Sequence, residues 1–146
     1  MPPSYHCHER ARPRSAAQAN SMLTNHGGIC LLYASRYSAR AVSLPAYQKF
    51  EVLAVYLHHA SLNLLVVVIY HPSSTAISST FFDEFDDALE HTATFSSAIA
   101  IVGDINIYLD VVNDPNTIKF LRSLDVHDLM QHVIGPTHRD GHTLVT

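Results

Sequence analysis

The chain has 146 residues, a length typical of a single domain, and 47% of them are hydrophobic while 15% are charged. The net charge of −4, with the histidines neutral, excludes nucleic-acid binding by bulk basic charge, so a nucleic-acid partner would need local arginines, helix N-termini or a metal ion. The two cysteines form no CxxC motif, so we expect a reducing, intracellular setting without a disulfide framework.

No segment is suited to enter or cross a membrane. The longest apolar run, residues 62–70, is interrupted by Asn63 and is far shorter than the ~20 residues that span a bilayer. The first residues carry arginines and prolines where a secretory signal needs an apolar segment. We therefore expect no membrane partner.

The first 26 residues show little hydrophobic periodicity. They include three prolines and three arginines, which favours an irregular segment. We expect an irregular lead-in over residues 1–26 and a folded domain over residues 27–146.

Three apolar runs then predict strands. Residues 29–35 form a short run, and residues 51–57 and 62–70 are apolar on both alternating faces, as in strands covered on both sides. The short polar link over 58–61 predicts an antiparallel hairpin between the last two strands.

A helix over residues 80–95 is predicted by its period, since Phe82, Phe85 and Leu89 share one face. Its N-cap is expected at Ser79 or at the residue that follows. Acidic residues cover much of the remaining surface, which favours a solvated face, with a protein-binding face as the alternative.

A strand and a second helix complete the predicted order. Residues 98–102 form a short apolar strand, and Asp114 followed by Pro115 is a strong helix start. The buried stripe of this helix is expected at Ile118, Leu121 and Leu124. The chain closes with a strand-like piece. This order of elements predicts an α/β sandwich with mixed sheets.

The most informative motif is Gly103-Asp104-Ile105-Asn106, at the end of the last predicted strand. Residues two apart on a strand point the same way, so Asp104 and Asn106 are expected to face one spot. The carboxylate offers a base or an anchor for an attacking water, and the carboxamide offers a donor to a phosphate oxygen. The alternative is an ordinary strand end, because Asp and Asn commonly close loops.

Several blocks, in this order and spacing, resemble the endonuclease/exonuclease/phosphatase superfamily, in the branch that forms the endonuclease domain of non-LTR (LINE-type) retrotransposons. The blocks are IYHPSS (69–74), FFDEFDDALE (81–90), AIAIVGDINIYLD (98–110) and FLRSLDVHDLMQHVIGPTHRDGHTL (120–144). The resemblance implies a two-sheet α/β sandwich of the deoxyribonuclease I-like type, associated with a reverse transcriptase. It also implies phosphodiester hydrolysis with a divalent ion, usually Mg²⁺, and DNA as the substrate.

The resemblance assigns roles to five residues. Asp104 orients or deprotonates the attacking water, Asn106 contacts the scissile phosphate, and the hydroxyl of Tyr70 approaches the phosphate. His71 stands where this branch commonly has arginine, and a mostly neutral imidazole weakens a phosphate contact. Thr137, in the block GPTHR, is placed near the substrate groove.

The chain departs from the family pattern at both ends. The family's metal-binding glutamate follows a strand, whereas Glu9 follows no apolar run, and the family's terminal Ser-Asp-His block has no counterpart in the printed sequence. We expect a domain truncated at both ends, without a complete Mg²⁺ site and inactive alone. Its exposed sheet edges are expected to favour self-association. The alternative is a non-catalytic remnant that acts only by binding or self-association.

Two further groups of residues are read as structural. The histidines of the C-terminal region lack the spacing of a zinc site; they are His127, His132, His138 and His142. Cys30, on a predicted strand, is expected to be an inert buried thiol.

Overall fold

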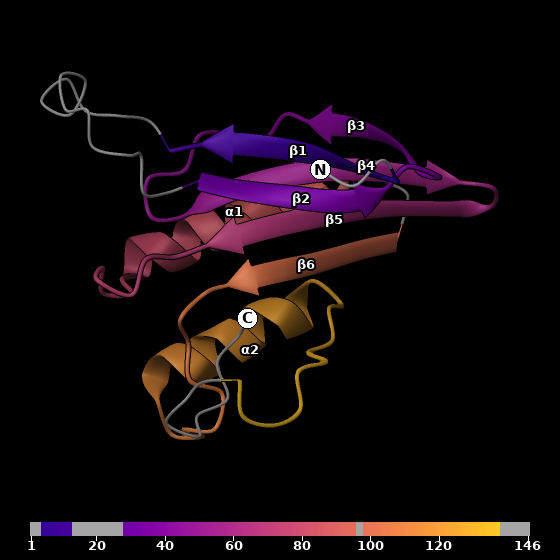
Figure 1. Cartoon of the computed structure of the whole chain (residues 1–146). Helices are drawn as coiled ribbons and strands as arrows, with labels where there is room; N and C mark the ends of the chain where they lie inside the picture. Colours follow the sequence, from indigo (N-terminus) through magenta and orange to yellow (C-terminus); the bar gives the residue numbers. More distant parts are fainter. Residues whose placement is uncertain (1–3, 13–27, 96–97, 138–146) are drawn as a thin grey trace, which may run out of the picture.

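The computed structural model describes residues 4–12, 28–95 and 98–137, and it has two β-sheets and two helices (Figure 1). The strands are β1 (Tyr5–Ala11), β2 (Gly28–Ala34), β3 (Ser38–Val42), β4 (Glu51–His59), β5 (Leu62–Tyr70) and β6 (Ala98–Asp104). The helices are α1 (Ser79–Ala93) and α2 (Pro115–Val126). The expected α/β class and the two-sheet arrangement are confirmed.

The larger sheet has the strand order β3-β4-β5-β6. β4 and β5 form the predicted antiparallel hairpin, with a register that runs from the pair Glu51–Tyr70 to the pair His59–Leu62. Ala60 in the turn has a φ of 52°. β6 pairs in parallel with β5, because the crossover through α1 returns the chain to the same end of the sheet.

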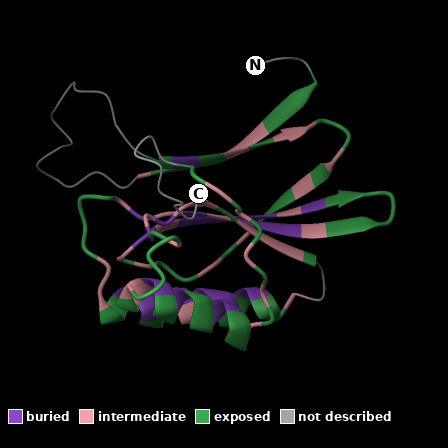
Figure 2. Ribbon diagram, turned by 90° about the horizontal axis from the view of Figure 1, so that it is seen from below, coloured by how far each residue is buried: buried purple, intermediate pink, exposed green. Residues whose placement is uncertain are grey.

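Both faces of this sheet are covered, which explains why β4 and β5 are apolar on both alternating faces over most of their length. The helices lie on one side and the two-stranded sheet of β1 and β2 lies on the other (Figure 2). The core on the helix side includes Val52, Val67, Phe81 and Phe85. The core on the β1–β2 side is smaller and is built around Val55, with no exposed surface, and Ile29.

The predicted lead-in over residues 1–26 was wrong for residues 4–12, which include β1. β1 pairs with β2 over its whole length, yet most of its residues are exposed. A strand with so little buried apolar surface leaves no hydrophobic period in the sequence. Residues 1–3 and 13–26 lie outside the described residues. β3 was not predicted either, because it has five residues and a partly exposed pattern.

The helix α1 buries the predicted stripe of Phe82, Phe85 and Leu89. Its N-cap is Ser78, whose hydroxyl accepts a hydrogen bond from the backbone N–H of Phe81 at 3.3 Å. The N-cap expected at Ser79 or its neighbour was therefore displaced by one or two residues, as is common when several hydroxyl residues precede a helix.

The acidic face of α1 is partly committed to the fold. One oxygen of Glu84 accepts the backbone N–H groups of Gln48 and Lys49 at 2.9 and 2.8 Å. Asp87 accepts a hydrogen bond from the hydroxyl of Tyr47 at 2.8 Å. These acids hold the segment between β3 and β4 against the helix, so the face is more than a solvated surface.

The helix α2 begins as predicted, with Asp114 as N-cap and Pro115 in the first turn. Its buried stripe was wrong in part, because Ile118 and Leu121 are exposed. The buried residues are Thr117, Phe120, Ser123 and Leu124. Packing of the Phe120 ring on Phe85, with centroids 5.4 Å apart, determines which face turns inward.

The chain after α2 contains no helix or strand between residues 128 and 137. The strand-like closing piece was therefore not found there, and residues 138–146 lie outside the described residues. Within the described part of the chain, no helix is both long and apolar enough to span a membrane.

Candidate functional site

Three polar residues lie side by side at one end of the larger sheet. Glu51 begins β4, Tyr70 ends β5 and Asp104 ends β6. The register pairs Glu51 with Tyr70 and Tyr70 with Asp104. Directly paired residues project toward the same face of a sheet. The end of the sheet therefore presents the phenol of Tyr70 between two carboxylates, on the face that packs against β1 and β2. The strands that carry the two carboxylates, β4 and β6, are about 10 Å apart.

The backbone at Gly103 leaves no room for a side chain beside β5. Its φ is +130°, and a Cβ at this position would lie 1.9 Å from the carbonyl oxygen of Ile69. Neither the backbone conformation nor the space allows a side chain. The glycine of the motif thus has a definite structural reason, and it directly precedes Asp104, which pairs with Tyr70.

Asp104 and Asn106 form a closed turn at the end of β6. The carboxylate of Asp104 accepts the backbone N–H of Asn106 at 3.2 Å, and Asn106 has a φ of 57°. Because the backbone of Asn106 is left-handed, the alternation of side chains along β6 ends before this residue. Asp104 and Asn106 are therefore connected by a turn and are not next neighbours on one face of a continuous strand.

The same turn is tied to the loop that follows β5. The amide Nδ2 of Asn106 donates to the carbonyl oxygen of His71 at 2.6 Å, and the N–H of His71 donates to the carbonyl oxygen of Asp104 at 2.8 Å. Asp104, Asn106 and the residue after Tyr70 are therefore joined by hydrogen bonds. One hydrogen-bonding group of Asn106 is already used within the fold.

The His71 ring faces the protein interior. The residue is 1% exposed, and neither ring nitrogen has a hydrogen-bond partner among the described residues. The ring packs edge-on against Phe81, with centroids 5.1 Å apart. Burial lowers the pKa of His71, and the negative charge of Asp104 partly offsets this effect. The ring is therefore neutral at pH 7 and contacts the core rather than an open surface.

Tyr70 and Glu51 are held by an arginine that sequence reasoning missed. Arg12, just after β1, forms an ion pair with Glu51, and its guanidinium lies 5.7 Å from the centre of the Tyr70 ring. The hydrogen bond to Glu51 is the main cause that raises the pKa of Arg12. The sequence hinted at a role for Glu51 only through its position directly before the apolar run of β4. No local feature of the sequence marks Arg12.

The two carboxylates beside Tyr70 already have partners within the fold. Magnesium binds through carboxylates and water in octahedral geometry, and here Glu51 is paired with Arg12 while Asp104 accepts a backbone N–H. Among the described residues, no three His, Cys, Asp or Glu side chains are grouped as metal ligands. His127 and His132 are included in that statement; His138 and His142 lie outside the described residues.

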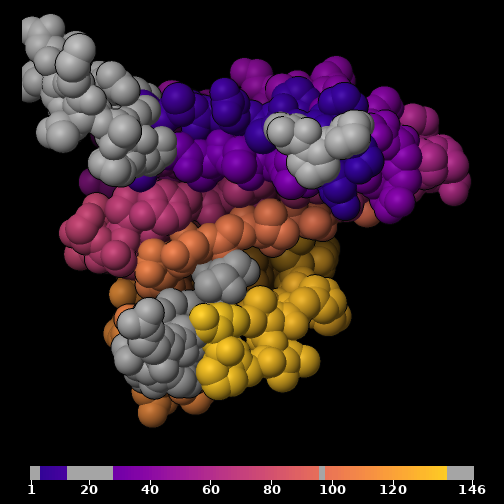
Figure 3. Space-filling view, in the orientation of Figure 1, coloured from indigo at the N-terminus to yellow at the C-terminus, as the bar shows by residue number. Residues whose placement is uncertain are grey.

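A groove of about 590 Å³ lies next to the motif, between the outer edge of β6 and the segment after α2. Gly103 and Ile105 line it on one side, and residues 128–133 line it on the other. β6 runs along this surface above the C-terminal segment (Figure 3). Thr137 lies beyond this segment and is exposed; it is not among the residues that line the groove.

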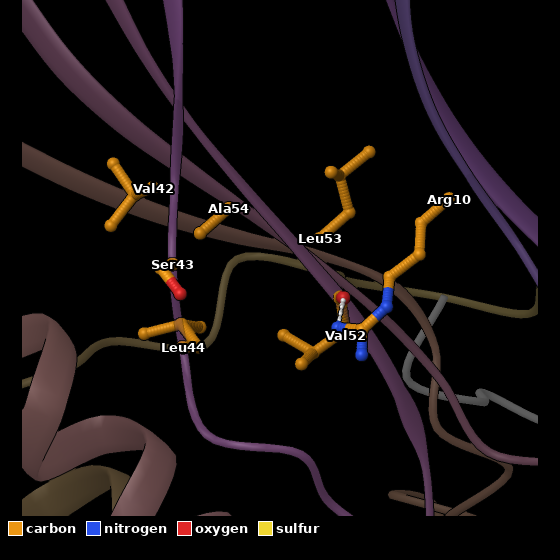
Figure 4. Close-up of a pocket in the computed structure, with 7 residues that line it drawn as sticks. All are labelled: Arg10, Val42, Ser43, Leu44, Val52, Leu53 and Ala54. Atoms are coloured by element: carbon orange, nitrogen blue, oxygen red, sulfur yellow. Dashed lines mark hydrogen bonds between the residues drawn. The ribbon is translucent and has the colours of Figure 1, made fainter.

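A smaller cavity of about 180 Å³ lies at the end of β3 (Figure 4). Arg10 donates a hydrogen bond to the carbonyl oxygen of Val52 at 2.8 Å, two residues beyond the last β3–β4 pair, Val42–Ala54. Arg10 thus caps the part of β4 that β3 does not cover. With Arg12 it attaches β1 to β4.

The fold and the site together define a small α/β protein whose larger sheet ends in a row of polar side chains. Comparison with protein-family models, with curated proteins and with solved structures found no match for this chain.

Proposed function

We propose that the chain is a phosphodiesterase-type domain of the DNA endonuclease class, with the deoxyribonuclease I-like sandwich implied by its resemblance to LINE-type retrotransposon endonucleases. The observation that carries the proposal is the pairing of Tyr70 with Asp104, beside which Asn106 is held by hydrogen bonds to Asp104 and to the carbonyl oxygen of His71. These are the residues to which the resemblance assigns phosphodiester chemistry. The substrate is the DNA backbone, and Mg²⁺ is the ion that the family uses.

The roles follow from the chemistry of each group. The second carboxylate oxygen of Asp104 can orient a water molecule, and the Tyr70 hydroxyl can donate to a phosphate oxygen. The side-chain amide of Asn106 already donates one N–H to the carbonyl oxygen of His71. Its other N–H can donate to a phosphate oxygen. His71 and Thr137 belong to the proposed substrate-binding set from the resemblance alone.

We also propose that this chain does not cleave DNA by itself. Metal ions stabilise the charge of a phosphoryl transition state by several kcal/mol, and Glu51, the carboxylate beside Tyr70, is neutralised by Arg12. Each ~1.4 kcal/mol of lost stabilisation lowers the rate tenfold. A site without a prepared metal position is therefore expected to be many powers of ten slower than a complete one.

Incubation of the purified chain with supercoiled plasmid and Mg²⁺ tests the inactivity. We expect wild type and Asp104→Ala to give the same background of nicked circles. Nicking by the wild type that disappears in Asp104→Ala would overturn the proposed inactivity and would support the assigned role of Asp104.

Titration with a short DNA duplex, followed by nuclear magnetic resonance, tests the class of substrate. We expect the largest shifts at Tyr70, Asp104 and Asn106, and weaker binding for Tyr70→Phe than for Tyr108→Phe, which removes the hydroxyl of a 45% exposed tyrosine after β6. Shifts confined to other faces, or no shift at millimolar DNA, would overturn the proposal.

Self-association is the second candidate function, and the outer edge of β6 favours it. Within the described residues, β6 pairs only with β5, and Val102 on β6 is 42% exposed. An unpaired strand edge offers backbone N–H and C=O groups to a second chain.

A further inference from the structure

The two cysteines lie on neighbouring strands of the smaller sheet. The antiparallel register of β1 and β2 pairs Cys7 with Leu32 and Glu9 with Cys30. Residues two apart on a strand share a face, and paired residues share it too. Cys7 and Cys30 are therefore diagonal neighbours on one face of the two-stranded sheet.

This face points away from the rest of the protein. The alternate residues of β2, Ile29, Leu31 and Tyr33, belong to the core between the two sheets. Cys30 is exposed and Cys7 is partly exposed. The expectation that Cys30 is a buried thiol was therefore wrong, because its strand covers the larger sheet with the opposite face.

The register makes Cys30 a near neighbour of the Cys7 thiol. The pKa of the Cys7 thiol is raised, first by burial and then by the neighbouring Cys30. The Sγ of Cys7 donates its hydrogen bond to the carbonyl oxygen of His8, at 3.5 Å. Cys30, the more exposed of the pair, is the one that a dissolved reagent reaches first.

We propose that Cys7 and Cys30 form a reversible disulfide bond, which makes the outer face of the β1–β2 sheet a redox-sensitive site. The oxidant is a low-molecular-weight disulfide such as oxidised glutathione. The Cys30 thiolate attacks one of its sulfur atoms, and one glutathione thiolate leaves with the electron pair of the broken S–S bond. The Cys7 thiolate then attacks the sulfur of Cys30 and displaces the second glutathione thiolate.

The atoms and electrons of this exchange balance. Two protein thiols are oxidised to one disulfide, one glutathione disulfide is reduced to two thiols, and the protons of Cys7 and Cys30 end on the released glutathione. Diagonal neighbours lie about 7–8 Å apart, just beyond the ~6.8 Å reach of an unstrained bridge. The bond therefore needs a small shift of β1 against β2, and the resulting strain makes it readily reducible.

The test is oxidation of the full chain with oxidised glutathione, followed by intact mass and peptide mapping. We expect a monomer that has lost two hydrogen atoms and a cross-linked peptide pair containing Cys7 and Cys30. The variant Cys7→Ser should instead stop at a glutathione adduct on Cys30. The wild type should show a higher urea midpoint after oxidation, and reduction should reverse it.

Three results would overturn the proposal. The first is a wild type that keeps glutathione adducts on both cysteines. The second is a disulfide between two chains. The third is a wild type whose Cys30 stays unmodified under conditions that modify Cys30 in the Cys7→Ser variant. Because none of these measurements involves DNA, the outcome is independent of the proposed nuclease class.

Discussion

Gly103, His71 and Asn106 show how single residues at the end of β6 serve the fold as well as the proposed site. Gly103 allows contact with the carbonyl of Ile69, and Asn106 closes the turn through the carbonyl of His71. The ring of His71 fills the core beside Phe81. Asp104 also takes part in these contacts, because its carboxylate accepts the N–H of Asn106.

Substitution Gly103→Ala is expected to destabilise the protein strongly. A positive φ costs about 1–3 kcal/mol for a non-glycine residue, and overpacking against the carbonyl of Ile69 adds about 1–3 kcal/mol. Gly135→Ala is the matched control, because Gly135 also has a positive φ but no atom within 4 Å of the added Cβ. Urea unfolding should show the larger loss for Gly103→Ala; equal losses would contradict the close approach.

Stability is expected to fall in acid because of His71. Its pKa is lowered in the folded state, so between that value and its ordinary value near 6.5 the unfolded chain binds more protons. The free energy of unfolding therefore decreases as the pH falls below about 6.5, by at most ~1.4 kcal/mol per pH unit from this residue. The loss ends once the pH is below the folded pKa.

Comparison with His71→Leu isolates this effect from the other histidines. The variant removes two buried nitrogen atoms without partners, so we expect little loss of stability at pH 7.5 and a smaller loss than in wild type between pH 7.5 and 5.5. Urea midpoints at the two pH values measure both quantities. Parallel pH profiles of the two proteins would exclude His71 as the titrating group.

At the scale of the elements, the long and periodic ones were predictable from sequence. β4, β5 and α1 bury strong apolar patterns, and α2 begins at a clear cap. The inward face of α2 was not predictable, because Ile118 and Phe120 are both apolar and only the position of Phe85 selects between them. β1 and β3 are too short and too exposed to leave a pattern.

The cap of α2 gives a prediction at this scale. Asp114 accepts the backbone N–H groups of Asn116 and Thr117 at 2.9 and 3.0 Å. Asp114→Ala is expected to cost about 1 kcal/mol, within the range of 0.5–2 kcal/mol for N-cap losses. Asp114→Asn, which keeps the acceptor oxygen, should cost much less. Thermal unfolding of the three proteins measures the difference, and an equal loss in both variants would argue against a capping role.

The whole molecule is a stack of three layers, with the larger sheet in the middle (Figure 2). Arg10 and Arg12 attach the smaller sheet to β4 near the candidate site, so the layer contacts and the polar row share residues. β6 is an edge strand of the larger sheet, and its outer side lies next to the groove that it forms with residues 128–133. Within the described residues β6 pairs only with β5, and we expect a second chain to pair at its open edge.

Self-association should depend on that edge. We expect the sedimentation coefficient of the wild type to rise with concentration, and Val102→Lys on β6 to abolish the rise, since a lysine on an edge strand opposes pairing. Val112→Lys is the control, because Val112 is 75% exposed in the loop after β6. A wild type that stays monomeric at all concentrations, or an equal effect of both lysines, would refute pairing through β6.

The sequence alone determined the order of the main strands and helices, the hairpin and the start of α2. These features depend on local periodicity, caps and backbone conformation, which neighbouring residues specify. Only the tertiary structure decided the partners of Glu51 and Tyr70, the burial of the His71 ring and the exposure of Cys30. Those outcomes depend on contacts between residues far apart in the chain, such as Arg12 and Glu51, 39 positions apart. A local pattern specifies what a segment can form, whereas its neighbours in space decide which face is covered.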